Sequence, residues 1–160
     1  MGMYTGLRFK GNIKLEFRKD IDAVVNGDKH WKQCENPVLK SFGYVERAHM
    51  IPFGALAYMP DSWETMKEGG TDWEDMIATD GFELSFNKDT GRLTFQCSLK
   101  NYHDEIDIFI SNVIPEICES VEHCEEYYEE DEVSDLYYLE DGEMVRYEGN
   151  RYKDEEIDWI

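Results

Sequence analysis

Nearly all of the excess negative charge of this chain lies in its last third, and this uneven distribution limits how that segment can fold. Residues 101–160 contain 21 acidic and 3 basic residues, whereas residues 1–50 contain 9 basic and 6 acidic residues. No lysine or arginine occurs between Asp104 and Glu143. Because ionised carboxylates are costly to bury without a partner, the segment must keep a solvated face, pack against the basic N-terminal third, or meet a basic partner.

The length and the aromatic content predict one folded domain spanning residues 1–160. The chain has 160 residues, 41% of them hydrophobic, with 8 Phe, 10 Tyr and 4 Trp. That is enough apolar surface for a packed core, although a net charge of −20 is more typical of disordered chains. Like charges repel, so this net negative charge excludes direct binding to nucleic acid and to anionic membranes.

The sequence also favours a cytoplasmic location. No stretch approaches the roughly 20 apolar residues of a membrane span, and the first residues lack the apolar core of a secretory signal. The four cysteines form no CxxC pair, which favours reduced thiols.

Period-two alternation predicts the strands. Apolar residues occupy the odd positions from Leu7 to Phe17. Two alternating runs within 82–99 flank a turn at 87–91, where Gly91 is suited to a positive φ. A second hairpin is predicted at 136–147 around Asp141 and Gly142. Shorter strands are expected near 44–49 and 55–59, inside an irregular excursion over about 50–81, and the tail 150–160 is expected to be loose.

Helical spacing predicts three helices. Residues 18–26 form a short helix, and residues 37–42 form another, with Asn36 as N-cap and Gly43 at the end. A long helix is predicted over 104–130, where apolar residues recur every three or four positions, with a kink or a restart near Pro115. The fold class is therefore α+β. It is an antiparallel sheet covered on one face by the long helix and the short helices, in an elaborated β-α-β-β-α-β order with a C-terminal hairpin.

On the predicted long helix, a row of acidic residues lies opposite the apolar stripe, with aromatic residues beside it. Carboxylates three or four residues apart on a helix repel one another, so the row either only keeps the surface solvated or binds a basic partner. Tyrosines are frequent anchors of protein interfaces. The candidate partner-binding residues are Glu116, Glu119, Glu122, Glu126, Tyr127, Glu129, Glu130 and Tyr137.

In composition, the segment 104–158 resembles small acidic counter-defence proteins of phages and mobile elements, including anti-CRISPR proteins and other DNA-mimic inhibitors. Acidic immunity proteins that plug basic nuclease toxins follow the same physics. The resemblance implies a non-enzymatic inhibitor that binds a basic nucleic-acid-processing enzyme through carboxylates placed where phosphates would be. An exposed strand edge near 134–147 would also allow a homodimer.

Two other functions are compatible with the residues. An aromatic-lined sheet would bind a small ligand, and its candidate residues are Phe82, Phe86, Phe95, Trp63 and Trp73. A carboxylate-based, metal-dependent hydrolase is the weaker alternative. The chain contains no phosphate-binding loop, nucleophile elbow, HExxH or EF-hand pattern, and no metal or cofactor is expected.

Overall fold

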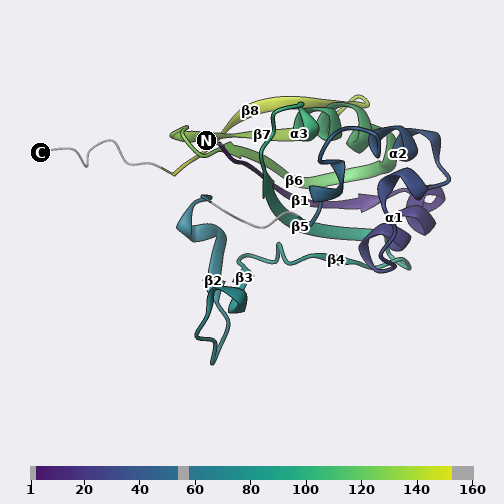
Figure 1. Cartoon of the computed structure of the whole chain (residues 1–160). Coiled ribbons are helices and arrows are strands. Elements are labelled where there is room, and N and C mark those ends of the chain that lie inside the picture. Colours follow the sequence, from purple (N-terminus) through teal and green to yellow (C-terminus); the bar gives the residue numbers. More distant parts are fainter. Residues whose placement is uncertain (1–2, 54–57, 153–160) are drawn as a thin grey trace, which may run out of the picture.

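The computed structural model describes residues 3–53 and 58–152, which form a single α+β domain built on a six-stranded antiparallel sheet (Figure 1). The strand order is β4-β5-β1-β6-β7-β8, so β1 lies inside the sheet and β8 is an edge. The strands are β1 Thr5–Ile13, β4 Ser85–Phe86, β5 Arg92–Leu99, β6 Cys118–Tyr128, β7 Val133–Glu140 and β8 Glu143–Arg151.

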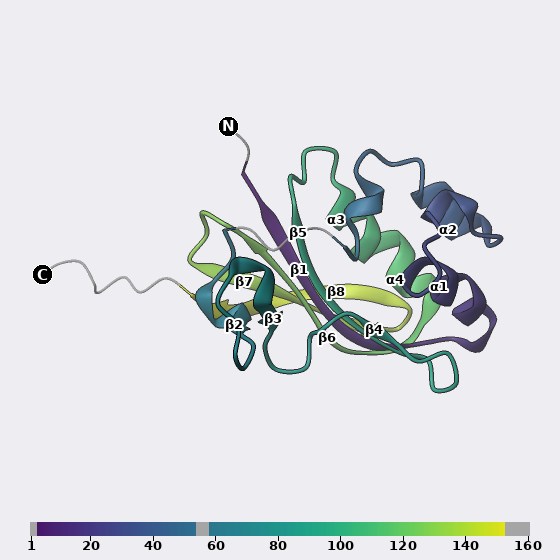
Figure 2. The same ribbon diagram turned by 60° about the horizontal axis from the view of Figure 1, so that its bottom comes forward.

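Short helices cover one face of this sheet (Figures 1 and 2). The α-helices are α1 Arg18–Val25, α2 Pro37–Phe42, α3 Glu105–Ile108 and α4 Ile114–Ile117, with a π-helical turn at Phe109–Val113. Single 3-10 turns occur at Leu15–Phe17, Trp31–Gln33, Ala48–Met50, Asp61–Trp63 and Trp73–Asp75. Within the described ranges, none of the helices has the length and apolar character needed to cross a bilayer.

The core lies between the helices and the sheet. Leu7 and Phe9 of β1 and Phe95 of β5 pack there against Phe109 and Ile110, all nearly or fully inaccessible to solvent. All four cysteines are buried free thiols. Burial raises the pKa of the Cys118 thiol to about 12, which keeps it protonated and chemically inert.

Several local predictions are confirmed. The predicted helix at 18–26 is α1, and the Asn36 side chain accepts hydrogen bonds from the backbone N–H groups of Val38 and Leu39 at the start of α2. Strands β4 and β5 pair as a hairpin, and Gly91 has φ of +82° in its turn. Strands β7 and β8 pair around Asp141 and Gly142, both with positive φ.

The long helix predicted over 104–130 is wrong. Residues from Glu105 to Ile117 are helical without interruption, as two short α-helical pieces on either side of the π-helical turn Phe109–Val113, and Pro115 lies in the second α-helical piece directly after this turn. The chain then becomes extended, and β6 runs from Cys118 to Tyr128 between β1 and β7.

Two β-bulges explain why this strand has a helix-like pattern in the sequence. In this part of the pairing, every two residues of β1 are matched by three residues of β6. The opposed pairs are Phe9 with Cys124, Gly11 with Val121 and Ile13 with Cys118. The extra residues are Glu122 and Glu119. Each bulge adds one residue without changing the face, and the apolar spacing becomes three instead of two. The pattern therefore imitates one face of a helix.

Other parts of the predicted β-structure also change. The strand that starts near Leu7 ends at Ile13, where a 3-10 turn begins. No strand forms at 44–49, because tight turns and a left-handed Arg47, with φ of 64°, interrupt the extended backbone. The strand predicted at 55–59 falls mainly on residues 54–57, outside the described residues. The C-terminal segment predicted to be loose is part of β8 through Arg151, and residues 153–160 are outside the described residues.

A small hairpin belongs to neither layer. Strands β2 Glu64–Met66 and β3 Met76–Ala78 form a separate two-stranded sheet that extends away from the main sheet, on the side not covered by the helices (Figures 1 and 2). This hairpin accounts for much of the excursion predicted at 50–81.

Candidate functional site

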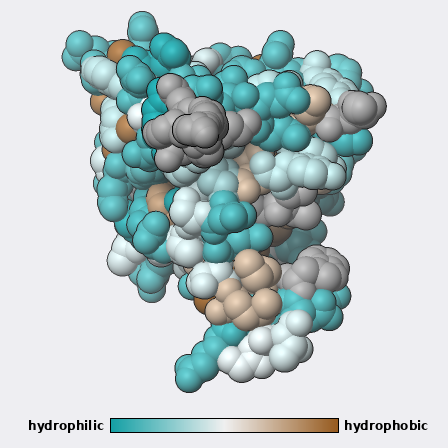
Figure 3. Space-filling view, turned by 90° about the vertical axis from the view of Figure 1, so that its left-hand side faces the viewer, coloured by the Kyte–Doolittle hydropathy of each residue, from teal (hydrophilic) through white to brown (hydrophobic). Residues whose placement is uncertain are grey.

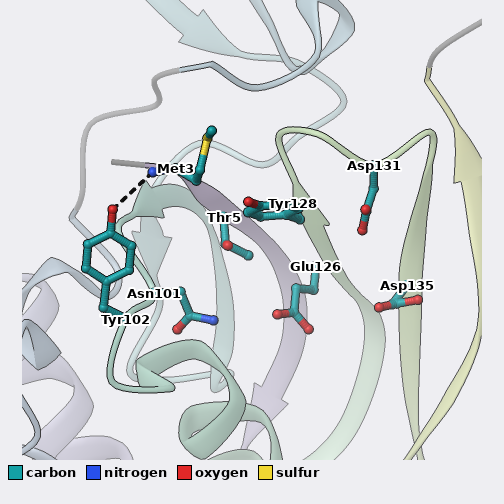
Figure 4. Close-up of a pocket in the computed structure, with 8 residues that line it drawn as sticks. All are labelled: Met3, Thr5, Asn101, Tyr102, Glu126, Tyr128, Asp131 and Asp135. Atoms are coloured by element: carbon teal, nitrogen blue, oxygen red, sulfur yellow. Dashed lines mark hydrogen bonds between the residues drawn. The ribbon is translucent and has the colours of Figure 1, made fainter. Parts of the chain in front are cut away.

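An open pocket of about 410 Å³ lies at the end of the sheet where β1 begins (Figure 4). Strand β1, the loop after β5, strand β6, the turn that follows it and strand β7 all contribute to its wall. The described residues that line it are Met3, Thr5, Asn101, Tyr102, Glu126, Tyr128, Asp131 and Asp135. Three of them are carboxylic acids, two are tyrosines, and none is basic.

Glu126 is the innermost acid of this group. It lies opposite Leu7 of β1 and therefore points to the helix-covered side of the sheet. The Tyr137 hydroxyl donates to its Oε1 at 3.3 Å, and its side chain also hydrogen-bonds to Asp107. Burial, followed by the charges of Asp107 and Asp135, raises the pKa of Glu126 to about 8. Glu126 therefore carries a proton at neutral pH in the free protein.

The loop after β5 forms the opposite wall. The Asn101 side chain accepts a hydrogen bond from the Ile106 backbone at 2.8 Å and donates one to Asp107 at 3.2 Å, which ties the loop to the first turn of α3. The Met3 backbone donates to the Tyr102 hydroxyl at 3.3 Å (Figure 4). Tyr102 is 54% exposed, and the Arg47 guanidinium lies over its ring at 5.6 Å from the ring centroid.

The predicted acidic row is split by the strand geometry. Glu116 is exposed at the end of α4, and Glu119 and Glu122 are the exposed bulge residues of β6. Arg92 pairs with Glu122 at 2.6 Å. The strand does not place these side chains in one line with Glu126, which enters the pocket.

The remaining predicted residues lie near the pocket or behind it. Glu129 and Glu130 follow β6 in the turn that bears Asp131, and Glu129 accepts a hydrogen bond from the Tyr4 backbone. Tyr137 contacts Glu126 as described above. Tyr127 is buried at 3% exposure, and it points to the other face of the sheet.

That other face has its own buried acid, Glu125. Its carboxylate is 1% exposed and hydrogen-bonds to His123 at 3.0 Å, Ser134 at 2.6 Å, Asn150 at 3.0 Å and Tyr152 at 2.7 Å. Burial raises the pKa of Glu125, but these four hydrogen bonds outweigh burial and lower its pKa to about 2. Glu125 is therefore an ionised, fully satisfied structural group.

The aromatic residues proposed for a small ligand are divided between the two faces of the sheet. Phe86 and Phe95 belong to the core between the helices and the sheet. Trp63 is fully buried, and Phe82 packs against Arg8 and His123 on the other face. None of the four lines the acidic pocket. Trp73 begins a 3-10 turn, and its side chain lies outside the described part of the structure.

No metal centre is formed by the residues that the structure describes. Among them, no three His, Cys, Asp or Glu side chains are grouped so as to hold an ion. Comparisons with protein-family models, with curated proteins and with solved structures found no match to this chain.

Of the predicted partner-binding residues, Glu126 lines the pocket and Tyr137 contacts Glu126, whereas most of the lining residues were not predicted. Thr5, Asn101 and Tyr102 come from the start of one strand and from a loop, and no local pattern joins them to β6. Asp131 carried a usable signal, because it continues the acidic run directly after Glu130.

Proposed function

We propose that this protein is a non-enzymatic acidic binding protein that occupies a basic surface of a nucleic-acid-processing enzyme, in the manner of counter-defence or immunity proteins. One observation carries the proposal. Glu126, Asp131 and Asp135 converge with Tyr102 and Tyr128 on one open pocket, and none of the described residues that line it is basic, although Arg146 pairs with Asp135 at 2.9 Å from outside the lining.

The chemistry of this wall suits a lysine or arginine side chain of the partner. Carboxylates accept charge-assisted hydrogen bonds from a guanidinium or an ammonium group, and tyrosine rings attract cations through their π faces. In the free protein, the proton on Glu126 limits repulsion among the three acids. An arriving cation would favour the ionised form, so binding would release this proton and become tighter as the pH rises toward about 8.

The acidic turn beside the pocket extends the same surface. Glu130 and Asp131 are exposed in the turn between β6 and β7, next to Glu129. In this proposal they supply the long-range attraction that brings a basic partner to the pocket. Tyr127 is buried, so the anchoring role expected for it passes to Tyr102 and Tyr128 at the rim.

Two matched double variants test the proposal. Glu130→Lys with Asp131→Lys reverses two charges in the β6–β7 turn, and Glu140→Lys with Glu143→Lys makes the same change in net charge in the β7–β8 hairpin. The wild-type protein is immobilised, and host protein that it retains and that DNA displaces is identified and purified. The affinity of this purified partner is then measured for all three proteins by calorimetry.

We expect the first variant to lose at least about tenfold in affinity, because each lost charge pair with a partner is worth about 1 kcal/mol or more. The second variant should change affinity by less than about threefold. Retention of no DNA-displaceable protein would contradict the proposed function. Equal losses in both variants would contradict the assignment of the pocket.

A further inference from the structure

The 64–78 hairpin projects from the body of the molecule. It forms its own two-stranded sheet and lies apart from the six main strands in Figure 1. In the space-filling view it is the projection at the lower edge, where apolar surface is mixed with hydrophilic surface (Figure 3). A hairpin of this size is marginally stable by itself in water, so its order must come from its anchorage.

A buried arginine anchors the base of this hairpin. Arg8 is 5% exposed, and its guanidinium donates to the carbonyl oxygens of Trp63 at 3.3 Å and Thr79 at 3.1 Å. These two residues are where the chain enters and leaves the hairpin. The Gln96 side chain donates to the same Trp63 carbonyl at 3.0 Å, and the Trp63 ring is fully buried. Burying a guanidinium is costly, and here it fixes both legs of a projecting element.

The tip is also held in one conformation. The Asp75 carboxylate accepts hydrogen bonds from the backbone N–H groups of Thr71 at 2.9 Å and Asp72 at 3.2 Å. Lys67 lies 3.5 Å from the same carboxylate and pairs with it. The hairpin is therefore presented as a preorganised shape, which reduces the entropy lost on binding.

The exposed surface of the hairpin combines acid with apolar side chains. It carries Glu64, Glu68, Asp72, Glu74 and Asp75 against a single basic residue, Lys67. Met66 is 41% exposed and Ile77 is 36% exposed. They point to opposite faces of the ribbon, because Met66 pairs with Met76 while Ile77 pairs with Thr65.

The charge of the hairpin decides what it can bind. Nucleic acid and a second copy of this chain, with its net charge of −20, would both be repelled. A basic protein groove would be attracted, and apolar patches within it would accept Met66 and Ile77. The hairpin base also lies at the pocket end of the sheet, where Trp63 packs against Tyr127 at 6.3 Å between ring centroids.

We propose that the 64–78 hairpin is a second docking element, which enters a basic groove of the same partner with Met66 and Ile77 as apolar contacts. This inference rests on the proposed function, since it needs a partner with a basic surface. It assigns the hairpin a binding role that is separate from the pocket.

The test uses the purified, DNA-displaceable partner described above and the full-length protein. Glu68→Lys with Glu74→Lys reverses two exposed hairpin charges that make none of the tip hydrogen bonds described. Its matched control is Glu16→Lys with Glu83→Lys, two exposed acids outside both the hairpin and the pocket. A third variant, Met66→Ser with Ile77→Ser, removes the apolar contacts without any change in charge. Circular dichroism and thermal unfolding confirm that each variant is folded.

We expect the charge-reversed hairpin to bind at least about tenfold more weakly than wild type, the serine variant at least about threefold more weakly, and the control within about twofold of wild type. If both hairpin variants bind like wild type while Glu130→Lys with Asp131→Lys does not, the hairpin inference is overturned and the proposed function stands. If wild type retains no DNA-displaceable protein, both are overturned.

Discussion

Glu125 and Glu126 are adjacent in β6, yet they face opposite sides of the sheet and meet opposite environments. Glu125 lies opposite Arg8 and receives four side-chain hydrogen bonds, and its pKa falls to about 2. Glu126 lies opposite Leu7, beside Asp107 and Asp135, and its pKa rises to about 8. Both are mostly buried, so burial alone does not set their ionisation.

The acidic segment therefore has two physical roles. On the face of the sheet that carries the 64–78 hairpin, an acid is paired and contributes to the fold. On the face of the pocket, an acid is surrounded by other acids and is costly in its ionised form. The acid beside the open pocket adds nothing to the stability of the fold. We therefore assign partner binding to the face of the sheet that carries the pocket.

The largest expected effect separates the two residues by stability. Glu125→Ala leaves Arg8 without the opposing charge and leaves buried donors unpaired, so we expect the free energy of unfolding to fall by roughly 3–5 kcal/mol. Glu126→Gln should instead raise it at pH 7, because wild-type Glu126 must take up a proton there on folding, whereas the glutamine is already neutral. Urea unfolding monitored by tryptophan fluorescence measures both. Similar losses in the two variants would break the comparison.

Glu125 and Glu126 should also change the stability of the protein in opposite directions as the pH rises. The pKa of Glu125 is lowered on folding, so its stabilisation is complete above about 4.5 and is lost as the pH falls toward about 2. The pKa of Glu126 is raised, so the folded state holds the extra proton between about 4.5 and 8, and stability falls as the pH rises through that window.

The variant Glu126→Gln isolates the second contribution. Wild-type stability should decline between about pH 4.5 and 8 by up to about 1.4 kcal/mol per pH unit, which is the limit for one proton. The variant should lack this decline but should still lose the Glu125 contribution to stability as the pH falls below about 4.5. Urea unfolding at a series of pH values compares the two proteins. Parallel profiles for wild type and variant would show that Glu126 titrates in its ordinary range.

Sequence patterns predicted the parts of the fold that depend on local structure. The Asn36 cap, the turn at Gly91 and the hairpin at Asp141 and Gly142 each depend on a few neighbouring residues. The strand β6 could not be predicted in this way, because its two bulges exist only through its register with β1. The pocket was missed for the same reason, since the pairing of β1 with β6 brings Thr5 opposite Tyr128.

The smallest expected effect concerns the two bulge residues. Glu119→Ala should change the free energy of unfolding by no more than about 0.5 kcal/mol, because the side chain is exposed. Glu122→Ala removes the exposed ion pair with Arg92 and should cost between about 0 and 1 kcal/mol. The same urea titrations measure both. A loss above about 2 kcal/mol from either residue would mean that these bulges carry structural roles like that of Glu125.

The most direct test of the account is a carboxyl-carbon NMR titration of Glu125 and Glu126, made with and without a short polyarginine peptide. We expect Glu126 to titrate near pH 8 in the free protein and at lower pH with the peptide, while Glu125 stays ionised down to about pH 2 in both samples. A Glu126 that titrates in the ordinary range and does not respond to the peptide would contradict the assignment of the pocket as a site for a basic partner.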